Sequence, residues 1–337
     1  MIEILIFFFV TLFFSLISNK FNLLPNYSGE KHQSFLDENK VPLVGGILFL
    51  FSSIYFFFEI NLFFCLAILF IFFIGFLSDT KFLNSPKIRI FFQTIVVAMT
   101  VYILDIQISS TRIELLDKII QIKLLGIFFS IFCLLILING SNFIDGLNGL
   151  LLGYTLIILF ILIKLNLFND LEVNDSKILF LFFSLSILLI FNFYNKFYLG
   201  DSGSYLIGFV TGFLLITIYN LSSVISPYFI ILLVWYPCFE NLFSILRKNK
   251  FKNSPIIADD KHLHQLIYFY LRKNFSKTNL YSNNLGSLMI NLYNFLIMYL
   301  ASTNISDTKF QVFLIFVNLV VYLFCYIYLF NFRFKKK

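Results

Sequence analysis

Long apolar runs, each close to the length that crosses a lipid bilayer, recur along nearly the whole of this 337-residue chain. A membrane-spanning helix needs about 20 apolar residues, with roughly 17 to 25 the usual range. Apolar residues make up 59% of the chain and charged residues only 13%. That is more apolar surface than a soluble core of this length can hide. We therefore predict an all-α integral membrane protein that forms a single polytopic domain over residues 1–337.

The same length criterion predicts about eleven transmembrane helices. Their expected ranges are 2–18, 43–60, 61–78, 88–106, 122–140, 148–166, 177–194, 205–222, 225–245, 284–303 and 309–331. With the N-terminus outside, most of the 25 Lys and Arg residues fall in the loops on the inner side. Cytoplasmic loops collect positive charge. The charge pattern therefore predicts an outer N-terminus and a cytoplasmic C-terminus.

The longest inner loop, residues 246–283, combines basic residues with aromatic ones and holds two of the three histidines, His262 and His264. It is expected to contain a short helix lying at the membrane interface. Two histidines at i and i+2 do not share a helix face, so a zinc pair is not indicated. They suit donation to anionic oxygens, and the alternative is a solvated basic loop near anionic lipid head groups.

The segment from Asn139 to Gly149 interrupts two apolar runs with amides, glycines and a single acid. Asn142, Asp145 and Asn148 are three residues apart, so on a helical turn they share one face. Such oxygen ligands suit a hard cation or the hydroxyls of a sugar. The glycines leave backbone N–H groups able to meet a phosphate at a helix start. We interpret this segment as functional.

Two further aspartates stand at the ends of predicted spans. Asp79 closes the third span, where it is either a loop charge balanced by Lys81 or Arg89 or a functional carboxylate. Asp201 directly precedes the eighth span, where it is either an N-cap or part of a clamp for Mg²⁺ and phosphate. Gly45 and Gly46 open the second span, and they indicate either helix packing or close approach of a ligand.

All of these polar clusters fall on the same predicted side of the membrane. Carboxylates, glycines and histidines gathered there indicate a site for a metal ion and phosphates, and hence an enzyme acting on a lipid phosphate. A transporter or flippase is the main rival, but its polar residues are expected near the bilayer midplane and often in repeated halves. A purely structural anchor gives no reason for Asp145 or Asp201.

The clusters, in this order, resemble the polyprenyl-phosphate N-acetylhexosamine-1-phosphate transferases, which are the glycosyltransferase family 4 membrane enzymes of the MraY and WecA type. The resemblance runs from about Lys31 to Gln265 and is closer to the WecA-like branch. It is carried by Val41-Pro-Leu-Val-Gly-Gly46, Gly75-Phe-Leu-Ser-Asp79, Asn142-Phe-Ile-Asp-Gly-Leu-Asn-Gly149, Gly200-Asp-Ser-Gly-Ser204 and His262-Leu-His264.

Carried over motif by motif, the resemblance implies catalytic roles for Asp79, Asp145 and Asp201. Asp79 is the expected base or phosphate-activating group. Asp201 is the expected Mg²⁺ ligand, with Asp79 as a second ligand and Mn²⁺ as the alternative cation. The residues that the resemblance implies in substrate binding are Lys31, His32, Gly45, Gly46, Asn142, Asn148, His262 and His264.

The implied activity is transfer of an N-acetylhexosamine-1-phosphate from a UDP-sugar to undecaprenyl phosphate, with release of UMP. This step starts a lipid-linked cell-envelope polysaccharide such as O-antigen, on the cytoplasmic side of a bacterial inner (plasma) membrane. Membrane lipid is an expected partner, nucleic acid is not, and a homodimer is left open. A phospho-MurNAc-pentapeptide transferase is the alternative within the family. Three positions depart from the family pattern, since Ser78 and Asn148 stand where Asp is common and Gln265 where His is common.

Overall fold

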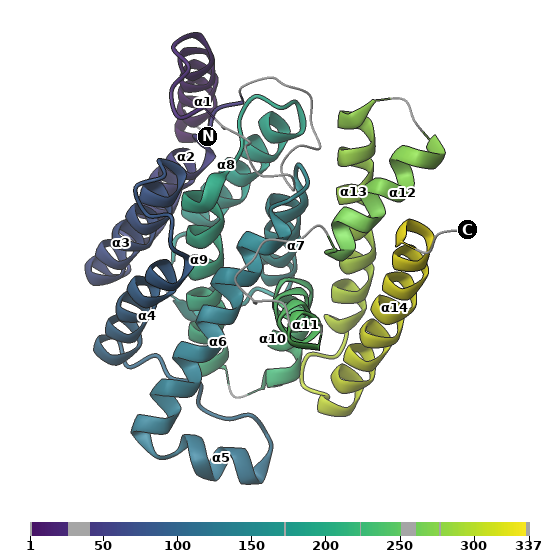
Figure 1. The fold of residues 1–337 in the computed structure, drawn as a ribbon. Helices are drawn as coiled ribbons and strands as arrows, with labels where there is room; N and C mark the ends of the chain where they lie inside the picture. Colours follow the sequence, from purple (N-terminus) through teal and green to yellow (C-terminus); the bar gives the residue numbers. More distant parts are fainter. Residues whose placement is uncertain are drawn as a thin grey trace.

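The computed structural model of the chain describes residues 2–25, 41–171, 173–222, 224–250, 261–275 and 278–334. Over these residues the predicted all-α architecture is confirmed, because every regular element is a helix (Figure 1). The elements are α1 (Ile2–Lys20), α2 (Gly45–Phe57), α3 (Leu62–Asp79), α4 (Pro86–Ile103), α5 (Glu114–Ile120), α6 (Lys123–Ile144), α7 (Leu150–Lys164), the 3₁₀ turn η1 (Asn169–Leu171), α8 (Asp175–Phe193), α9 (Gly200–Leu221), α10 (Pro227–Leu233), α11 (Trp235–Lys250), α12 (Leu263–Phe275), α13 (Asn279–Ala301) and α14 (Thr308–Phe334).

Eight of the described helices are long and apolar enough to cross a bilayer, namely α1, α3, α4, α6, α8, α9, α13 and α14. Each coincides with a predicted span, in agreement with a multi-pass membrane protein. The apolar helices α2 and α7 have 13 and 15 residues. At 1.5 Å per residue they are about 20 and 22 Å long, which is less than the hydrocarbon thickness of about 30 Å. The count of eleven spans and the outer N-terminus stay predictions.

The predicted single span over residues 225–245 is wrong in its shape, because the helix breaks into α10 and α11 at an angle of 77°. Pro237 explains the position of the break. A proline inside a helix cannot donate a backbone hydrogen bond, and its ring collides with the carbonyl group four residues earlier. That earlier residue is Leu233, where α10 ends.

Helix α9 lies at the centre of the bundle and packs against α2, α3 and α6. Two close approaches depend on glycine. A Cβ atom at Gly46 would lie 2.6 Å from the backbone nitrogen of Gly203, and one at Gly75 would lie 2.4 Å from the Cα of Ser202. Any larger residue would push α2 or α3 away from the start of α9. Of the two alternatives for the glycine pair at the start of α2, the structure therefore favours helix packing.

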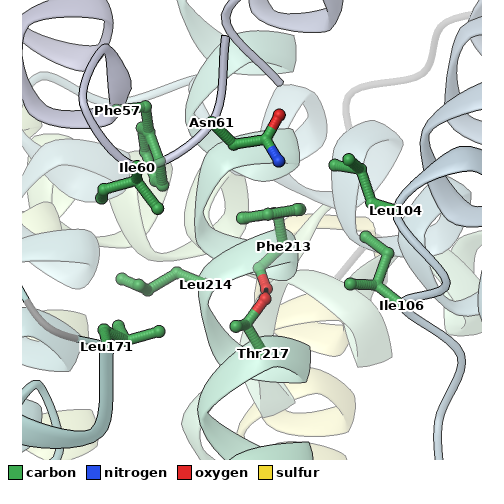
Figure 2. Close-up of a pocket in the computed structure, with 9 residues that line it drawn as sticks. All are labelled: Phe57, Ile60, Asn61, Leu104, Ile106, Leu171, Phe213, Leu214 and Thr217. Atoms are coloured by element: carbon green, nitrogen blue, oxygen red, sulfur yellow. Dashed lines mark hydrogen bonds between the residues drawn. The ribbon is translucent and has the colours of Figure 1, made fainter. Parts of the chain in front are cut away.

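The structure contains a cavity of about 210 Å³, whose lining residues are drawn in Figure 2. It is lined by Phe57, Ile60, Asn61, Leu104, Ile106, Leu171, Phe213, Leu214 and Thr217. Asn61 precedes α3 and Leu104 follows α4. The cavity therefore lies at the opposite ends of these two helices from Asp79 and Arg89, and it is not the site that the motifs predict.

Candidate active site

Asp79, the last residue of α3, caps the first turn of α9. Its Oδ1 accepts a hydrogen bond from the backbone N–H of Asp201 at 2.7 Å. Its Oδ2 accepts from the backbone N–H of Ser202 at 3.0 Å and from the Ser202 hydroxyl at 2.6 Å. The first N–H groups of a helix have no partner within the helix, and they carry the positive end of its dipole. The start of α9 thus meets the negative charge of Asp79.

Gly200 makes this cap sterically possible. Its φ angle is +73°, a conformation that residues with a side chain rarely adopt. A Cβ atom at this position would also lie 2.6 Å from Oδ2 of Asp79. The motif needs glycine here for the turn and for the approach of the carboxylate.

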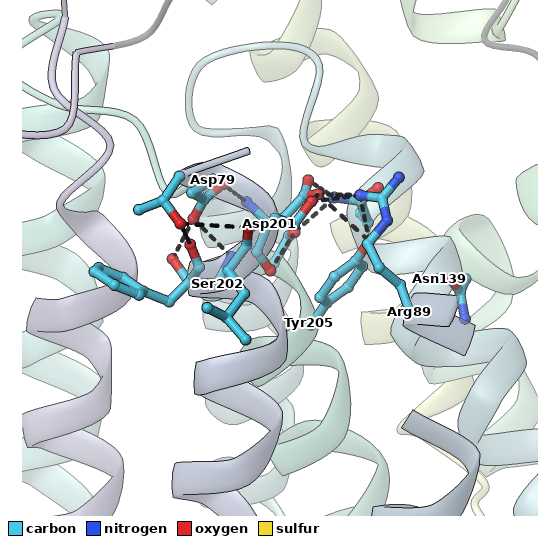
Figure 3. A network of polar contacts seen from close by, with 12 residues as sticks. Asp79, Arg89, Asn139, Asp201, Ser202 and Tyr205 are labelled. Atoms are coloured by element: carbon cyan, nitrogen blue, oxygen red, sulfur yellow. Dashed lines mark hydrogen bonds and ion pairs between the residues drawn. The ribbon is translucent and has the colours of Figure 1, made fainter. Parts of the chain in front are cut away.

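Asp201 lies inside the first turn of α9 and turns its side chain toward α4 and α6 (Figure 3). Its Oδ2 accepts from the Ser78 hydroxyl at 2.6 Å and pairs with the guanidinium of Arg89 at 2.5 Å. Its Oδ1 accepts from the side-chain amide of Asn142 at 2.7 Å. The interpretation of Asp201 as the N-cap of its own helix is therefore wrong, because Asp79 has that role.

Ser78 takes the place of a common family acid without leaving a gap in this network. Its hydroxyl donates to Asp201 and accepts from Nη1 of Arg89 at 2.6 Å. A second carboxylate at this position would add a negative charge beside Asp201. With serine, one guanidinium lies between a hydroxyl and a single carboxylate. The departure therefore lowers the negative charge of the site while the hydrogen bonds are kept.

Asp145 follows the end of α6 and is half-buried. Among the described residues, none donates a hydrogen bond to its carboxylate. Burial raises the pKa of Asp145 well above its usual range, and the negative charges of Asp201 and Asp79 raise it further. A cation close to Asp145 would offset both effects. Asp145 is thus the predicted catalytic residue whose charge is least compensated by the described part of the chain.

Asn148 holds the loop that contains Asp145. Its side-chain amide donates to Oδ1 of Asn195 at 2.6 Å, and its backbone N–H donates to Oδ1 of Asn283 at 2.7 Å. The neighbouring Gly149 is bonded by Asn192 on α8 and by Asn291 on α13. These contacts favour a structural role for the buried Asn148, and its predicted contact with substrate stays a prediction.

The two histidines lie against the Asn142–Gly149 segment, although they are far from it in sequence. The rings of His262 and His264 are stacked with centroids 5.6 Å apart, and the ring of His262 lies 5.3 Å from that of Phe143. His264 is fully buried, and its Nε2 would lie 2.5 Å from a Cβ atom at Gly146. Of the other predicted substrate contacts, Lys31 and His32 lie outside the described residues.

We expect Gly146→Ala to lower the activity of the protein by at least ten-fold. The added methyl group would press on the His264 ring, and a fully buried ring has little room to move. Turnover and thermal unfolding of the purified variant would be measured together. Gly286→Ala is the matched control, because the nearest atom to a Cβ there is Cδ1 of Leu147 at 3.2 Å. Equal turnover for Gly146→Ala and the control would contradict the predicted clash.

A divalent cation fits the chemistry of these side chains. Within the described residues, no three His, Cys, Asp or Glu side chains converge closely enough to hold a metal ion by themselves. Mg²⁺ does not need such a cage, since it is usually bound by one or two carboxylates, substrate phosphates and water. The carboxylates of Asp201 and Asp145 suit this pattern. Asp79 suits it less well, because both of its oxygens accept from backbone N–H groups fixed in α9, whereas the hydrogen-bond donors to Asp201 are side chains, which can turn away from a bound cation.

Arg89 and Glu240 contact the predicted site residues, although no functional role for either was predicted from the sequence. Arg89 begins α4 and pairs with Asp201. Glu240 is fully buried and contacts His262. The role of Glu240 could have been suspected from the sequence, since a lone acid within a predicted span is unusual and often functional. For Arg89, nothing in the sequence indicated a role beyond its position shortly after Asp79.

Comparison with known proteins agrees with this arrangement. The sequence model described as Glycosyl transferase family 4 matches residues 61–219. This range contains Asp79, Arg89, Asn142, Asp145 and Asp201, which are the residues that the structure brings together. Over these residues the chain is similar to glycosyl transferase family 4.

Three relatives show how far the likeness extends along the chain. The chain is 28% identical over 282 residues to the undecaprenyl-phosphate alpha-N-acetylglucosaminyl 1-phosphate transferase of Escherichia coli (strain K12), covering 78% of this chain and 74% of the relative. The protein with the same name from Thermotoga maritima is 26% identical over 265 residues, covering 78% and 79% of the two chains. A probable undecaprenyl-phosphate N-acetylglucosaminyl 1-phosphate transferase of Bacillus subtilis (strain 168) is 28% identical over 200 residues, covering 57% and 53%.

The site in the structure includes residues that lie outside the range matched by the family model. The matched range ends at residue 219, within α9. Both histidines lie beyond this range in the sequence, with His262 just before α12 and His264 on α12. The contact of His264 with Gly146 nevertheless joins the histidine segment to the matched part. The segment beyond the matched range thus completes one side of the site.

Proposed function

We propose that this chain transfers an N-acetylhexosamine-1-phosphate from a UDP-sugar to undecaprenyl phosphate and releases UMP. The observation that carries the proposal is the convergence of Asp79, Asp145, Asp201 and Arg89 at adjoining helix ends of an apolar bundle. Polar groups at helix ends suit a lipid phosphate held at the membrane surface. The names of the relatives from Escherichia coli and Thermotoga maritima support the same acceptor.

In the proposed reaction, a phosphate oxygen of undecaprenyl phosphate attacks the β-phosphorus of the UDP-sugar. A new P–O bond forms, and the bond between that phosphorus and the oxygen bridging to the α-phosphate breaks, so that UMP leaves. Direct attack needs no base to activate the nucleophile, because a phosphate monoester is already ionised near neutral pH. An intermediate on an aspartate is therefore not required.

The main obstacle is repulsion between two anions, and the chain offers specific residues against it. Arg89 holds a positive charge at the site, and its side chain is 20% exposed. Asn142 and Ser78 hold the Asp201 carboxylate in one orientation. Mg²⁺, when bound by Asp201 and Asp145, would neutralise phosphate charge in the transition state.

The proposal is tested with purified protein, undecaprenyl phosphate, Mg²⁺ and a panel of UDP-sugars that includes UDP-N-acetylglucosamine and UDP-MurNAc-pentapeptide. We expect UMP release with a UDP-N-acetylhexosamine, dependent on the lipid phosphate and abolished by a chelator. Mn²⁺ in place of Mg²⁺ tests the alternative cation. UMP release that does not require the lipid, or none with any nucleotide sugar, would contradict the proposal. Release with the pentapeptide substrate alone would assign the chain to the alternative activity.

A further inference from the structure

Glu240 is a fully buried carboxylate on α11. It is the single acid between Trp235 and Lys250, within a bent pair of helices that together have the length and composition of a membrane span. Burying a charge costs free energy unless the charge is paired and hydrogen-bonded, and ionisable residues at such places are commonly functional. The proposed reaction gives this residue no role so far.

Both oxygens of Glu240 are engaged by other elements. Oε1 lies 2.9 Å from Nδ1 of His262 and 3.4 Å from the backbone nitrogen of Leu263. Oε2 accepts from the hydroxyl of Tyr322 on α14 at 2.8 Å. An ionised carboxylate only accepts hydrogen bonds, so each of its partners must donate. The backbone N–H of Leu263 and the hydroxyl of Tyr322 can both donate. The same condition requires His262 to carry a proton on Nδ1 and to donate it to Glu240.

This bond orients the histidine segment. With Nδ1 directed at Glu240, the opposite edge of the imidazole, which bears Nε2, faces away from that carboxylate. The ring lies beside Phe143 and is stacked on His264, whose own ring packs on Gly146. Glu240 thus stands at one end of a continuous chain of contacts that reaches the loop of Asp145. A carboxylate that orients a functional histidine in this way is a recurrent arrangement in enzymes.

We propose that Glu240 is a positioning residue, which acts on sugar-phosphate transfer by holding the His262 ring against Phe143 at the end of α6 and against His264. The inference rests on the proposed function, in that transfer is the activity affected. Glu240 itself touches no reacting atom in this scheme. Its effect passes through His262, and that restriction makes the inference testable.

The first test compares Glu240→Gln with Glu240→Leu. Glutamine retains an oxygen that can accept from Nδ1–H, whereas leucine has a similar size and no acceptor. We expect Glu240→Leu to lower kcat by about 10- to 100-fold, as is typical when the partner that orients a functional histidine is lost. Glu240→Gln should recover most of that loss. The thermal unfolding midpoint of Glu240→Leu should fall, because the Tyr322 hydroxyl and Nδ1–H of His262 lose their acceptor while they stay buried. Turnover is therefore measured well below that midpoint, where the variant is folded.

Gln311→Leu is the matched control. Gln311 is a fully buried polar side chain on α14, and it bonds the carbonyl oxygens of Ala301 and Asn304 rather than the histidine segment. Its replacement should leave kcat within about two-fold of the parent protein. A loss of kcat in Gln311→Leu as large as that in Glu240→Leu, or a kcat of Glu240→Gln no higher than that of Glu240→Leu, would show a purely structural role and overturn the proposal.

A double-mutant cycle tests whether the effect passes through His262. In a His262→Ala background, Glu240→Leu should change kcat by less than about two-fold, because the ring that it positions is absent. If the losses of the two single variants multiply in the double variant, Glu240 acts independently of His262 and the proposal is wrong.

A spectroscopic test separates this inference from the proposed function. The chain has only three histidines, so the imidazole ¹⁵N resonances of histidine-labelled protein can be assigned with His262→Ala. We expect the His262 ring to carry a proton on Nδ1, and this signature to be lost in Glu240→Leu. A parent protein that releases no UMP would end the proposed function while the resonance still reports on the pair. A His262 resonance unchanged in Glu240→Leu would overturn the inference even if transfer is observed.

Discussion

Asp201→Asn is expected to lower sugar-phosphate transfer by about 10²–10³-fold or more, the range seen when one preorganised electrostatic group is removed from an active site. Asparagine has nearly the same shape, so its oxygen can still accept from Asn142 or Ser78. The lost property is the negative charge, which pairs with Arg89 and is the proposed attraction for Mg²⁺. UMP release by the purified variant is the measurement. The unfolding midpoint should change little.

Asp105→Asn is the control for removing one acid from the protein. Asp105 forms an exposed ion pair with Lys123, 3.3 Å long, between α4 and α6. Exposed pairs contribute little to stability, and this one has no contact with the proposed site. Turnover by Asp201→Asn that equals turnover by Asp105→Asn would remove Asp201 from the catalytic residues.

Asp79→Asn should lower both activity and stability, and in this it should differ from Asp201→Asn. The Asp79 carboxylate accepts hydrogen bonds from two backbone N–H groups of α9. An asparagine at this position would direct its NH₂ group at one of them, so that two donors would face each other. Loss of a helix cap costs about 0.5–2 kcal/mol, and hydrogen bonds to a charged group are worth about 1.5–3 kcal/mol. We therefore expect a lower unfolding midpoint together with a loss of transfer of at least ten-fold.

The neighbouring Thr80→Ala is the control for Asp79→Asn. Among the residues that the structure describes, the Thr80 hydroxyl bonds the carbonyl oxygens of Phe76 and Leu77 in the preceding helix and no other group. Its removal should leave transfer and the midpoint close to those of the parent protein. An Asp79→Asn protein that unfolds at the parental midpoint but is inactive would assign Asp79 to the chemistry alone. Full activity with a lowered midpoint would show that Asp79 acts only as the cap of α9.

Much of the helical architecture could be predicted because a bilayer imposes a length on each apolar run. The expected break near residues 59–61 is present, and Asn61 there caps α3 by accepting from the backbone N–H of Phe64. The bend at Val234 was missed, although Pro237 in the first turn of α11 was a visible signal. The short helix expected in the inner loop is present as α12, while its place at a membrane interface stays a prediction.

The site could be predicted as a set of motifs but not as a set of bonds. Asp79, Asn142 and Asp201 were recognised as functional candidates, yet nothing in their spacing shows that Asp79 caps α9 or that Arg89 pairs with Asp201. Asn148 shared a predicted face with Asn142, but its hydrogen bonds to Asn195, just after α8, and to Asn283 on α13 favour a structural role. Such contacts join residues more than 40 positions apart, and sequence periodicity reports only on neighbours within one helix.

The amino-acid order alone determined the class of the protein, the approximate places of its helices and the segments where chemistry is concentrated, because bilayer length and local polarity are properties of short stretches of chain. The partner of each carboxylate was decided only in the folded bundle. There, glycines at positions 46, 75 and 200 allow helices to approach closely enough for the start of α9 to receive Asp79. Because a buried carboxylate needs a hydrogen-bond donor, its partner is the donor that helix packing brings near it. Arg89 is that partner for Asp201, and His262 is that partner for Glu240.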